Sequence, residues 1–324
     1  MQRNTALRLV STRDLSHQDW LQVRNQGIGS SEAAAAVGLS PYTSPLALWQ
    51  HKTARLPPLD LSDNEAVFWG TTLEPIVAQV YQERTGRKVR RVNAVLQHPE
   101  HHFMLANLDR AVGAEGILEI KTAGQRSAAQ WEDTVPEAYQ CQVLHQLAVT
   151  GKAWADVAVL IAGQEFRIYR IEPDPVRMAD LIEREATFWQ HVQNDTPPPV
   201  DGTASSARAL AAMYPQDRGH SIDWSESAEL NTAFEALIEL KRQRQELQQQ
   251  EDLQQQTIQA AMGDASGAVF SNGRISWKRA RDSRSVDHKR LILEHPQLAV
   301  QYASTTPGVR RFLLQTNKTA AVAD

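Results

Sequence analysis

Two short apolar runs joined by a glycine-rich turn, FMLANLDR and ILEIKT, constrain the fold of this chain more than any other segment. Each run predicts a β-strand, and the AVGAEG stretch between them supplies the turn of a hairpin. With the turn centred in that stretch, Asp109 falls opposite Glu119, where side chains share a face with Cβ atoms roughly 5 Å apart. Strand alternation places Lys121 on the same face as Glu119.

Two carboxylates this close repel each other unless a positive charge lies between them. Mg²⁺ suits such a pair, because it binds one or two carboxylates and keeps water and phosphate oxygens as its other ligands. The ion polarises a phosphoryl oxygen and lowers the pKa of a bound water. Lys121 can position or deprotonate that water and neutralise developing charge. The pattern therefore predicts phosphodiester hydrolysis, although such a hairpin taken alone is more often a set of solvated acids with a lysine counter-ion.

Length and composition describe an ordinary globular protein with room for two domains. The chain has 324 residues, of which 42% are hydrophobic and 22% charged. Its only cysteine, Cys141, excludes an intramolecular disulfide and any Cys-based zinc site. We find no membrane-spanning apolar run and no signal segment at the amino terminus. We therefore expect a cytoplasmic protein without a membrane partner.

The order of patterns predicts an α/β nuclease-like domain followed by an appendage. Residues 1–200 alternate helical and strand patterns, which predicts a mixed β-sheet flanked by helices. A stretch rich in Pro, Ser and Ala predicts a linker over residues 201–225. Residues 226–324 predict a long helical arm and a basic β-hairpin with an Asn-Gly turn. Residues 267–318 carry ten Lys and Arg against three Asp and Glu, whereas the whole chain has a net charge of −4. That asymmetry indicates either a surface for a polyanion or a solvated face.

Four further residues are candidates for the same site. Glu74 lies among apolar neighbours in WGTTLEP, and an inward-facing glutamate there would need a partner such as a metal. Gln142 lies in the helical pattern YQCQVLHQL, where taken alone it is simply a polar position. In RNQGIGSSEAAAA, glycines allow close backbone approach, and Ser30 or Ser31 is the expected helix N-cap, where free N–H groups attract anions. Arg24 could complete an anion pocket by forked hydrogen bonds, but a structural cap explains the glycines nearly as well.

Taken in order, RNQGIGSSEAAAAVGLSPYTSPLALW, WGTTLEP, LDR, LEIKT and YQCQVLHQLAVTG resemble the YqaJ-like viral recombinases, the phage lambda exonuclease family of the PD-(D/E)xK nuclease superfamily. The resemblance spans about residues 15–175. It implies a sheet of the restriction-endonuclease type and Mg²⁺-dependent digestion of double-stranded DNA ends from 5′ to 3′. Substitution of Mg²⁺ by Mn²⁺ stays open. The 3′ single-stranded tails would serve phage-type recombination with a single-strand annealing protein. The resemblance also implies a ring-shaped homo-oligomer, usually a trimer.

The resemblance assigns roles by motif matching. The implied metal ligands are Asp109, Glu119 and the main-chain carbonyl of Ile120. The implied catalytic residues are Lys121, Glu74 and Gln142. The implied 5′-phosphate and DNA-binding residues are Arg24 and Ser31. Two alternatives stay open: a structure-specific or nicking endonuclease on the same metal site, and a DNA-binding scaffold that has lost catalysis.

Overall fold

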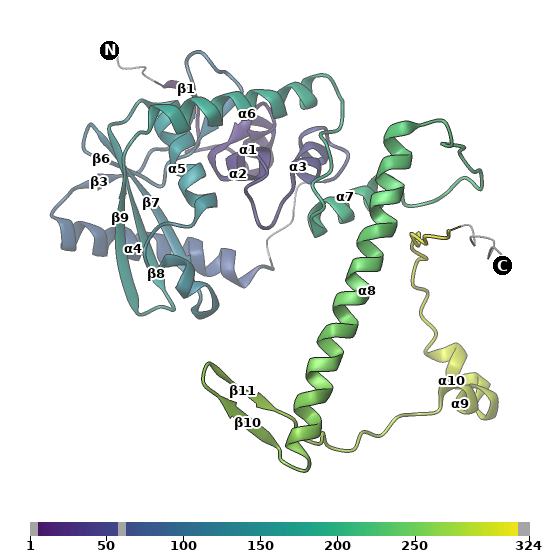
Figure 1. Ribbon diagram of the computed structural model, residues 1–324. Coiled ribbons are helices and arrows are strands. Elements are labelled where there is room, and N and C mark those ends of the chain that lie inside the picture. Colours follow the sequence, from purple (N-terminus) through teal and green to yellow (C-terminus); the bar gives the residue numbers. More distant parts are fainter. Residues whose placement is uncertain (1–5, 58–62, 317–324) are drawn as a thin grey trace. The chain divides into compact units, whose positions relative to one another are not determined.

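The computed structural model describes residues 6–57 and 63–316 (Figure 1). The chain divides into two compact units, Met1–Tyr214 and Pro215–Asp324. Within the described ranges, every helix is too short or too polar to cross a membrane.

The first unit is built on a five-stranded mixed sheet. Its strands, in spatial order, are β3 (Val89–Arg90), β6 (Arg110–Val112), β7 (Gly116–Ala123), β8 (Trp154–Ile161) and β9 (Glu165–Ile171). All neighbours are antiparallel except β7 and β8, which are parallel. A parallel pair needs a crossover, and α5 (Glu137–Thr150) provides it.

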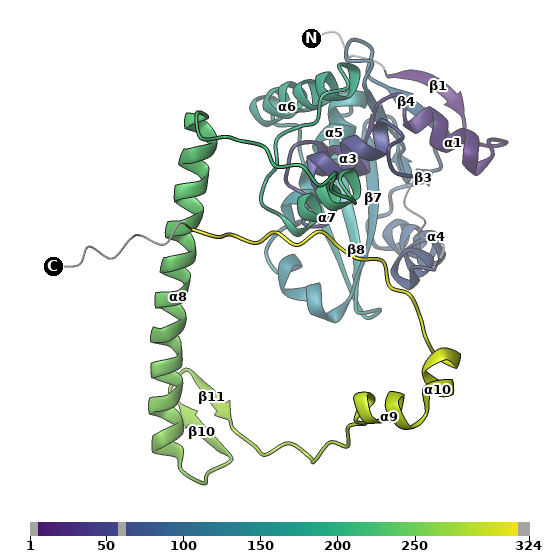
Figure 2. The same ribbon diagram turned by 90° about the vertical axis from the view of Figure 1, so that its right-hand side faces the viewer.

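Helices cover both faces of this sheet (Figure 2). On one face, Val143 and Leu147 of α5 pack on Ile117 and Val157 of the sheet, and α6 (Pro175–Gln193) lies against α5. On the other face, α4 (Glu65–Thr85) buries apolar side chains against the sheet. The predicted α/β fold with a mixed sheet between helices is therefore confirmed.

A second, four-stranded sheet corrects one prediction. Its order is β1 (Leu7–Ser11), β4 (Ala94–Gln97), β5 (Met104–Ala106) and β2 (Ile28–Gly29). The run FMLANLDR, predicted as one strand, splits into β5 in this sheet and β6 in the five-stranded sheet. Polar side chains interrupt it, because the Asn107 amide donates to the Ala94 carbonyl and the Asp109 carboxylate accepts from a main-chain N–H of β7.

Four short helical segments complete the approach to the site. They are α1 (His17–Arg24), the 3₁₀ turn Ser30–Glu32, α2 (Ala33–Ala36) and α3 (Pro45–Lys52). The long helix α4 accommodates Pro75 without a break and ends at Gly86, whose φ of 69° is left-handed.

The linker prediction needs a correction. A helix, α7 (Ala204–Met213), lies within the segment predicted as linker and packs on α3. Ala209 is 3% exposed in a core cluster with Leu46 and Trp49, and its carbonyl accepts from Gln50 Nε2 at 2.8 Å. The first unit therefore continues to Tyr214 instead of ending at residue 200, because the small apolar face of α7 finds a partner distant in sequence.

The second unit contains the predicted arm and hairpin. Its elements are α8 (Ala228–Met262), β10 (Gly267–Phe270), β11 (Gly273–Ser276), α9 (His288–Glu294) and α10 (Pro296–Gln301). The hairpin pairs Phe270 with Gly273, so its two turn residues are Ser271 and Asn272. No side chain of α8 is buried, and the helix is supported by intrahelical contacts such as the Arg242–Glu239 ion pair at 2.7 Å.

A buried ion pair joins three elements of the first unit. His145 on α5 contacts Glu185 on α6 at 2.8 Å through Nδ1, and its Nε2 donates to the Leu105 carbonyl at 2.9 Å. Both side chains are fully buried. Burial opposes the imidazolium charge, but the Glu185 carboxylate and the Leu105 carbonyl outweigh it and raise the pKa of His145.

We expect His145→Leu to lower the free energy of unfolding by about 3–5 kcal/mol, because it leaves the Glu185 carboxylate buried and unpaired. His145→Leu/Glu185→Leu should be less destabilised than His145→Leu alone. Because the pKa of His145 is raised in the folded state, the stabilisation is complete below the ordinary value of 6.5 and is lost as pH rises through the folded value. Urea unfolding of the four variants of the double-mutant cycle measures this. Additive losses would show that the two groups are not coupled.

Candidate active site

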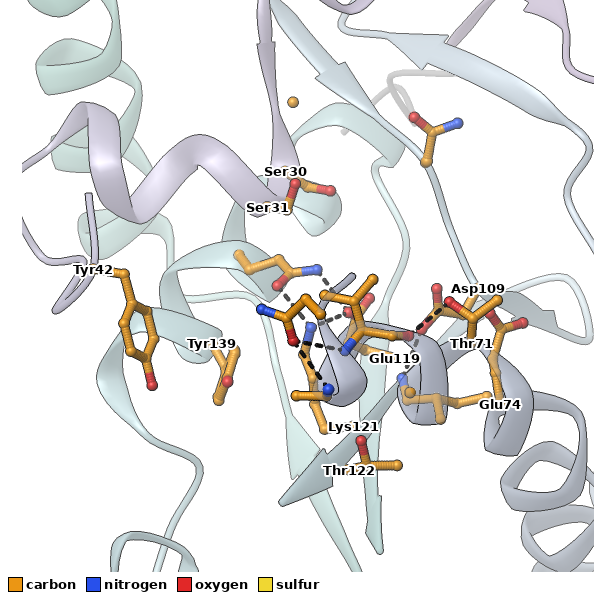
Figure 3. Close-up of a pocket in the computed structure, with 18 of the residues that line it drawn as sticks. Ser30, Ser31, Tyr42, Thr71, Glu74, Asp109, Glu119, Lys121, Thr122 and Tyr139 are labelled. Atoms are coloured by element: carbon orange, nitrogen blue, oxygen red, sulfur yellow. Dashed lines mark hydrogen bonds and ion pairs between the residues drawn. The ribbon is translucent and has the colours of Figure 1, made fainter. Parts of the chain in front are cut away.

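One pocket of the first unit collects every candidate residue predicted from the sequence. The pocket is lined by Arg24, Ser31, Glu74, Asp109, Glu119, Ile120, Lys121 and Gln142, together with other residues. In Figure 3 the labelled Asp109, Glu119 and Lys121 lie in the middle of the pocket, with Ser31 and Glu74 farther out. Helices α1, α4 and α5, the 3₁₀ turn and strand β7 all contribute to it.

The hairpin register brings the two carboxylates together. Arg110 pairs with Leu118, so the residue before β6, Asp109, faces Glu119 across the ladder. Asp109 Oδ2 accepts a hydrogen bond from the N–H of Ile120 at 2.8 Å. Lys121 Nζ lies 2.7 Å from Glu119 Oε1. The three side chains therefore share one face, as strand alternation predicts.

Its surroundings perturb the Asp109 carboxyl. Burial, followed by the negative charge of Glu119, raises the pKa of Asp109 to about 8. Burial opposes the ammonium of Lys121, but contact with Glu119 outweighs it and raises the pKa of that lysine. Without a further cation, the site at neutral pH therefore combines an ammonium at Lys121 with a neutral carboxyl at Asp109. Raising the pKa of Lys121 also favours a positioning role for it over deprotonation of water.

The donor set suits a hard divalent cation. A cation beside Asp109 and Glu119 would relieve the repulsion that raises the pKa of Asp109, and both are oxygen donors. Across the two described ranges, no three His, Cys, Asp or Glu side chains are grouped to hold a metal. An ion here could thus be held by two carboxylates and main-chain, water or phosphate oxygens, the habit of Mg²⁺.

Two glutamines of α5 hold the buried Glu119 carboxylate. Gln142 Nε2 donates to Glu119 Oε1 at 2.6 Å, and Gln142 Oε1 accepts from Lys121 Nζ at 3.0 Å. Gln146, one helical turn later, donates to Glu119 Oε2 at 2.7 Å. The sequence-based prediction missed Gln146. Its spacing of four from Gln142, on an otherwise apolar helix face, was the available signal.

Glu74 lies at the side of the acid pair. Its carboxylate forms an ion pair with Arg110, and its charge contributes a smaller rise to the pKa of Asp109. The side chain of Arg110 is 7% exposed and that of Glu74 30%. Arg110 was not predicted as a site residue, because nothing local in LDRAVG distinguishes it from a surface arginine.

Arg24 and Ser31 meet, although seven residues apart in the sequence. Arg24 Nη2 donates to Ser31 Oγ at 2.9 Å, and the guanidinium lies over the Trp20 ring. A Cβ on Gly29 would lie 2.8 Å from Arg24 Nη2, so this position must be glycine for Arg24 to lie against the main chain. The expected N-cap is wrong: Gly29 occupies it, and the Glu32 carboxylate accepts from its N–H at 2.8 Å.

An ion pair between Glu32 and the buried Lys52 supports Arg24 from behind. Lys52 Nζ donates to Glu32 Oε2 at 2.7 Å and to the Arg24 carbonyl at 2.9 Å. Glu32 Oε1 lies 3.4 Å from Arg24 Nη2. The Lys52 side chain is 1% exposed, so Glu32 and Lys52 position Arg24 without facing the pocket. Twenty residues separate the two in sequence, and no local pattern predicts their contact.

We expect Asp109→Asn to stabilise the metal-free protein at alkaline pH. The folded pKa of about 8 lies above the ordinary 3.8, so the folded state binds a proton that the unfolded state releases. Stability of the native sequence should therefore fall as pH rises from about 4 to about 8, and the substitution should remove that slope.

Thermal unfolding with a chelator at several pH values tests this expectation. Asp180→Asn, at an exposed position on α6, is the matched control and should leave the slope unchanged. A pH dependence of Asp109→Asn equal to that of the native sequence would contradict the raised pKa.

The mixed sheet, with two facing acids and a lysine in one pocket, defines an α/β domain that carries a D…E-x-K set. The profile of the YqaJ-like viral recombinase domain matches residues 19–153. Uncharacterized protein YqaJ of Bacillus subtilis (strain 168) is 35% identical over 310 residues, which cover 94% of this chain and 96% of that protein. The chain belongs to the YqaJ-like viral recombinase family. An alignment of this length also extends into the second unit.

The chain also resembles solved structures. An alkaline exonuclease (LHK-Exo) from Laribacter hongkongensis is 22% identical, with a TM-score of 0.49 over 55% of this chain and 93% of that chain. LHK-Exo in complex with dAMP is 23% identical, with a TM-score of 0.47 over the same shares. A phage related exonuclease from Haemophilus somnus 129PT is 11% identical, with a TM-score of 0.42 over 52% and 94%.

Proposed function

We propose that the protein is a Mg²⁺-dependent 5′-to-3′ exonuclease of double-stranded DNA that leaves 3′ single-stranded tails for phage-type homologous recombination. The observation that carries this proposal is the meeting of two sets of groups in one pocket. Asp109, Glu119 and Lys121 suit phosphodiester hydrolysis, and Arg24 with Ser31 suits a terminal phosphate. Membership of a viral recombinase family supports the recombination role.

The metal would be held by the two carboxylates of the hairpin and the Ile120 carbonyl. Bound Mg²⁺, or Mn²⁺ in its place, would supply Lewis-acid polarisation of the scissile phosphoryl group. The chain's own groups do the rest: Gln142 and Gln146 hold both oxygens of Glu119, so that its carboxylate does not swing away. The Lys121 ammonium orients the attacking water and neutralises the charge that develops on the phosphoryl oxygens.

Arg24 and Ser31 would set the polarity of digestion. A guanidinium donates two forked hydrogen bonds to phosphate oxygens, and a hydroxyl donates one. A 5′-phosphate held there would place the following phosphodiester over the acid pair, so each cycle would remove nucleotides from the 5′ end. Glu32 and Lys52 fix the Arg24 guanidinium, which reduces the entropy lost on binding. By resemblance we also propose a ring-shaped homo-oligomer, a trimer, and a single-strand annealing protein as partner.

We expect Lys121→Ala to slow release of nucleotides from a linear duplex by about 10²–10³-fold, because one preorganised charge in the transition state is lost. DNA binding and thermal stability should stay close to those of the native sequence. Single-turnover digestion of a 5′-labelled duplex with and without Mg²⁺ measures the loss. Lys88→Ala, at an exposed position outside the pocket, is the control. Digestion by Lys121→Ala at the native rate would refute the site.

A covalently closed circular duplex in the same assay distinguishes the alternatives. An exonuclease needs an end, so the circle should stay intact while the linear duplex is digested from its 5′ label. Cutting of the circle would favour a structure-specific or nicking endonuclease. Binding without cleavage of either DNA would favour a scaffold that has lost catalysis.

We expect Arg24→Gln to slow digestion of 5′-phosphorylated ends about ten-fold or more, since a hydrogen bond to a charged group is worth about 1.5–3 kcal/mol. Digestion of 5′-hydroxyl ends should change much less. The ratio of the two rates on otherwise identical duplexes is the measurement, with Arg91→Gln, at an exposed position outside the pocket, as control. Equal slowing on both ends would remove the 5′-phosphate pocket from the proposal.

A further inference from the structure

In the second unit, helix α8 is followed by a small β-hairpin, residues 266–277, which we call the ribbon (Figure 1). Its register pairs Ala268 with Ile275 and Val269 with Arg274, and the N–H of Trp277 donates to the Ser266 carbonyl, which extends the ladder. Side chains alternate between the two faces of such a ladder. One face therefore carries Ala268, Phe270, Ile275 and Trp277, and the other carries Val269, Arg274 and Ser276.

The apolar face is left open to solvent. Phe270 and Trp277 are each 44% exposed, and none of the residues described between 215 and 316 is buried. A lone two-stranded hairpin is marginally stable in water, because it has no core of its own. The two aromatic rings are therefore not buried by packing within the hairpin. Exposed aromatic side chains grouped in this way mark a binding surface.

Positive charge is concentrated on the ribbon and the segment that follows it. Residues 274–290 carry seven Lys and Arg against two Asp, and all are exposed. Arg279 is paired with Asp282 and Arg290 with Glu294. The cations without an ion pair among the described residues are Arg274, Lys278, Arg281, Arg284 and Lys289. Helix α8, by contrast, carries three Lys and Arg against six Asp and Glu, so the net positive charge lies after the helix and not on it.

Aromatic rings interleaved with unneutralised cations match one polyanion best. In single-stranded nucleic acid the base faces are free to stack on aromatic side chains while the phosphates meet Lys and Arg. A duplex keeps its base faces covered, so it would use the cations but not Phe270 and Trp277. An acidic protein surface would likewise leave the rings without a specific partner.

We propose that the ribbon and the basic segment 274–290 form a site for single-stranded DNA, with bases stacked on Phe270 and Trp277 and phosphates bound by Lys278, Arg281 and Arg284. The inference rests on the proposed exonuclease function for the source of that strand, which would be the 3′ tail left by digestion. The binding site itself depends only on the ribbon and the basic segment. Retaining the tail would keep the enzyme on its DNA and the product extended for annealing.

The test measures binding of a fluorescent thirty-nucleotide oligo(dT) to the full-length chain by anisotropy, with a chelator present so that no cleavage occurs. Phe270→Ala/Trp277→Ala should weaken this binding about ten-fold or more, because each stacked base is lost. Lys278→Gln/Arg281→Gln/Arg284→Gln should reduce the slope of log affinity against log salt by about 2, at about 0.7 per phosphate contact. Lys241→Gln/Arg244→Gln on the exposed surface of α8 is the matched control and should change neither quantity.

Two further measurements keep the outcomes distinct. Trp277→Phe preserves an aromatic ring and should retain most of the affinity, which separates stacking from a loss of folding. Native affinity for oligo(dT) in the aromatic variant, or a loss of affinity confined to duplex of equal length, would overturn the proposal. Digestion of a short linear duplex with Mg²⁺ tests the nuclease separately: the ribbon variants should digest it at the native rate. An inactive native chain with ribbon-dependent oligo(dT) binding would refute only the nuclease.

Discussion

The antiparallel register of β6 on β7 holds the carboxyls of Asp109 and Glu119 together, and the site is arranged around their repulsion. Lys121 and two amides of α5 bind the Glu119 carboxylate. Asp109 instead accepts from the Ile120 main-chain N–H, and burial together with the charge of Glu119 raises its pKa. Such a pair is unfavourable without a cation. The parallel β7–β8 pair with its α5 crossover places the two glutamines of α5 against Glu119.

The part of the pocket that contains Arg24 and Ser31 also depends on supporting contacts. Arg24 reaches Ser31 only because Gly29 has no side chain and because Glu32 and Lys52 fix the guanidinium and the end of α1. Helix α5 has two roles. Its glutamines bind the Glu119 carboxylate, and its His145 contacts Glu185 of α6 and Leu105 of β5. Loss of the buried His145–Glu185 pair would therefore shift α5 and, with it, the glutamines that bind Glu119.

Much of the local structure could be predicted because its causes are local. A period of two with a glycine turn was sufficient to set Asp109 opposite Glu119 and Lys121 on the same face. Helix ends at Gly86 and Gly151 follow from the left-handed conformation that glycine adopts readily. The predictions that failed concerned which segments of the chain pair or pack with each other. FMLANLDR is locally a strand, yet its halves belong to different sheets, and α7 looked like linker because its partner, α3, lies far away in the sequence.

The sequence by itself determined the turn between Asp109 and Glu119, the long helices, the basic ribbon and, through five ordered motifs, the family. Those features depend on neighbours within a few turns or strands, where periodicity and turn chemistry act directly. Only the tertiary structure decided that Gln146 and Arg110 border the acid pair, that Glu32 and Lys52 lie behind Arg24, and that one pocket contains both sets. Contacts of this kind depend on chain segments that meet only after packing, and burial then sets the charge each group carries.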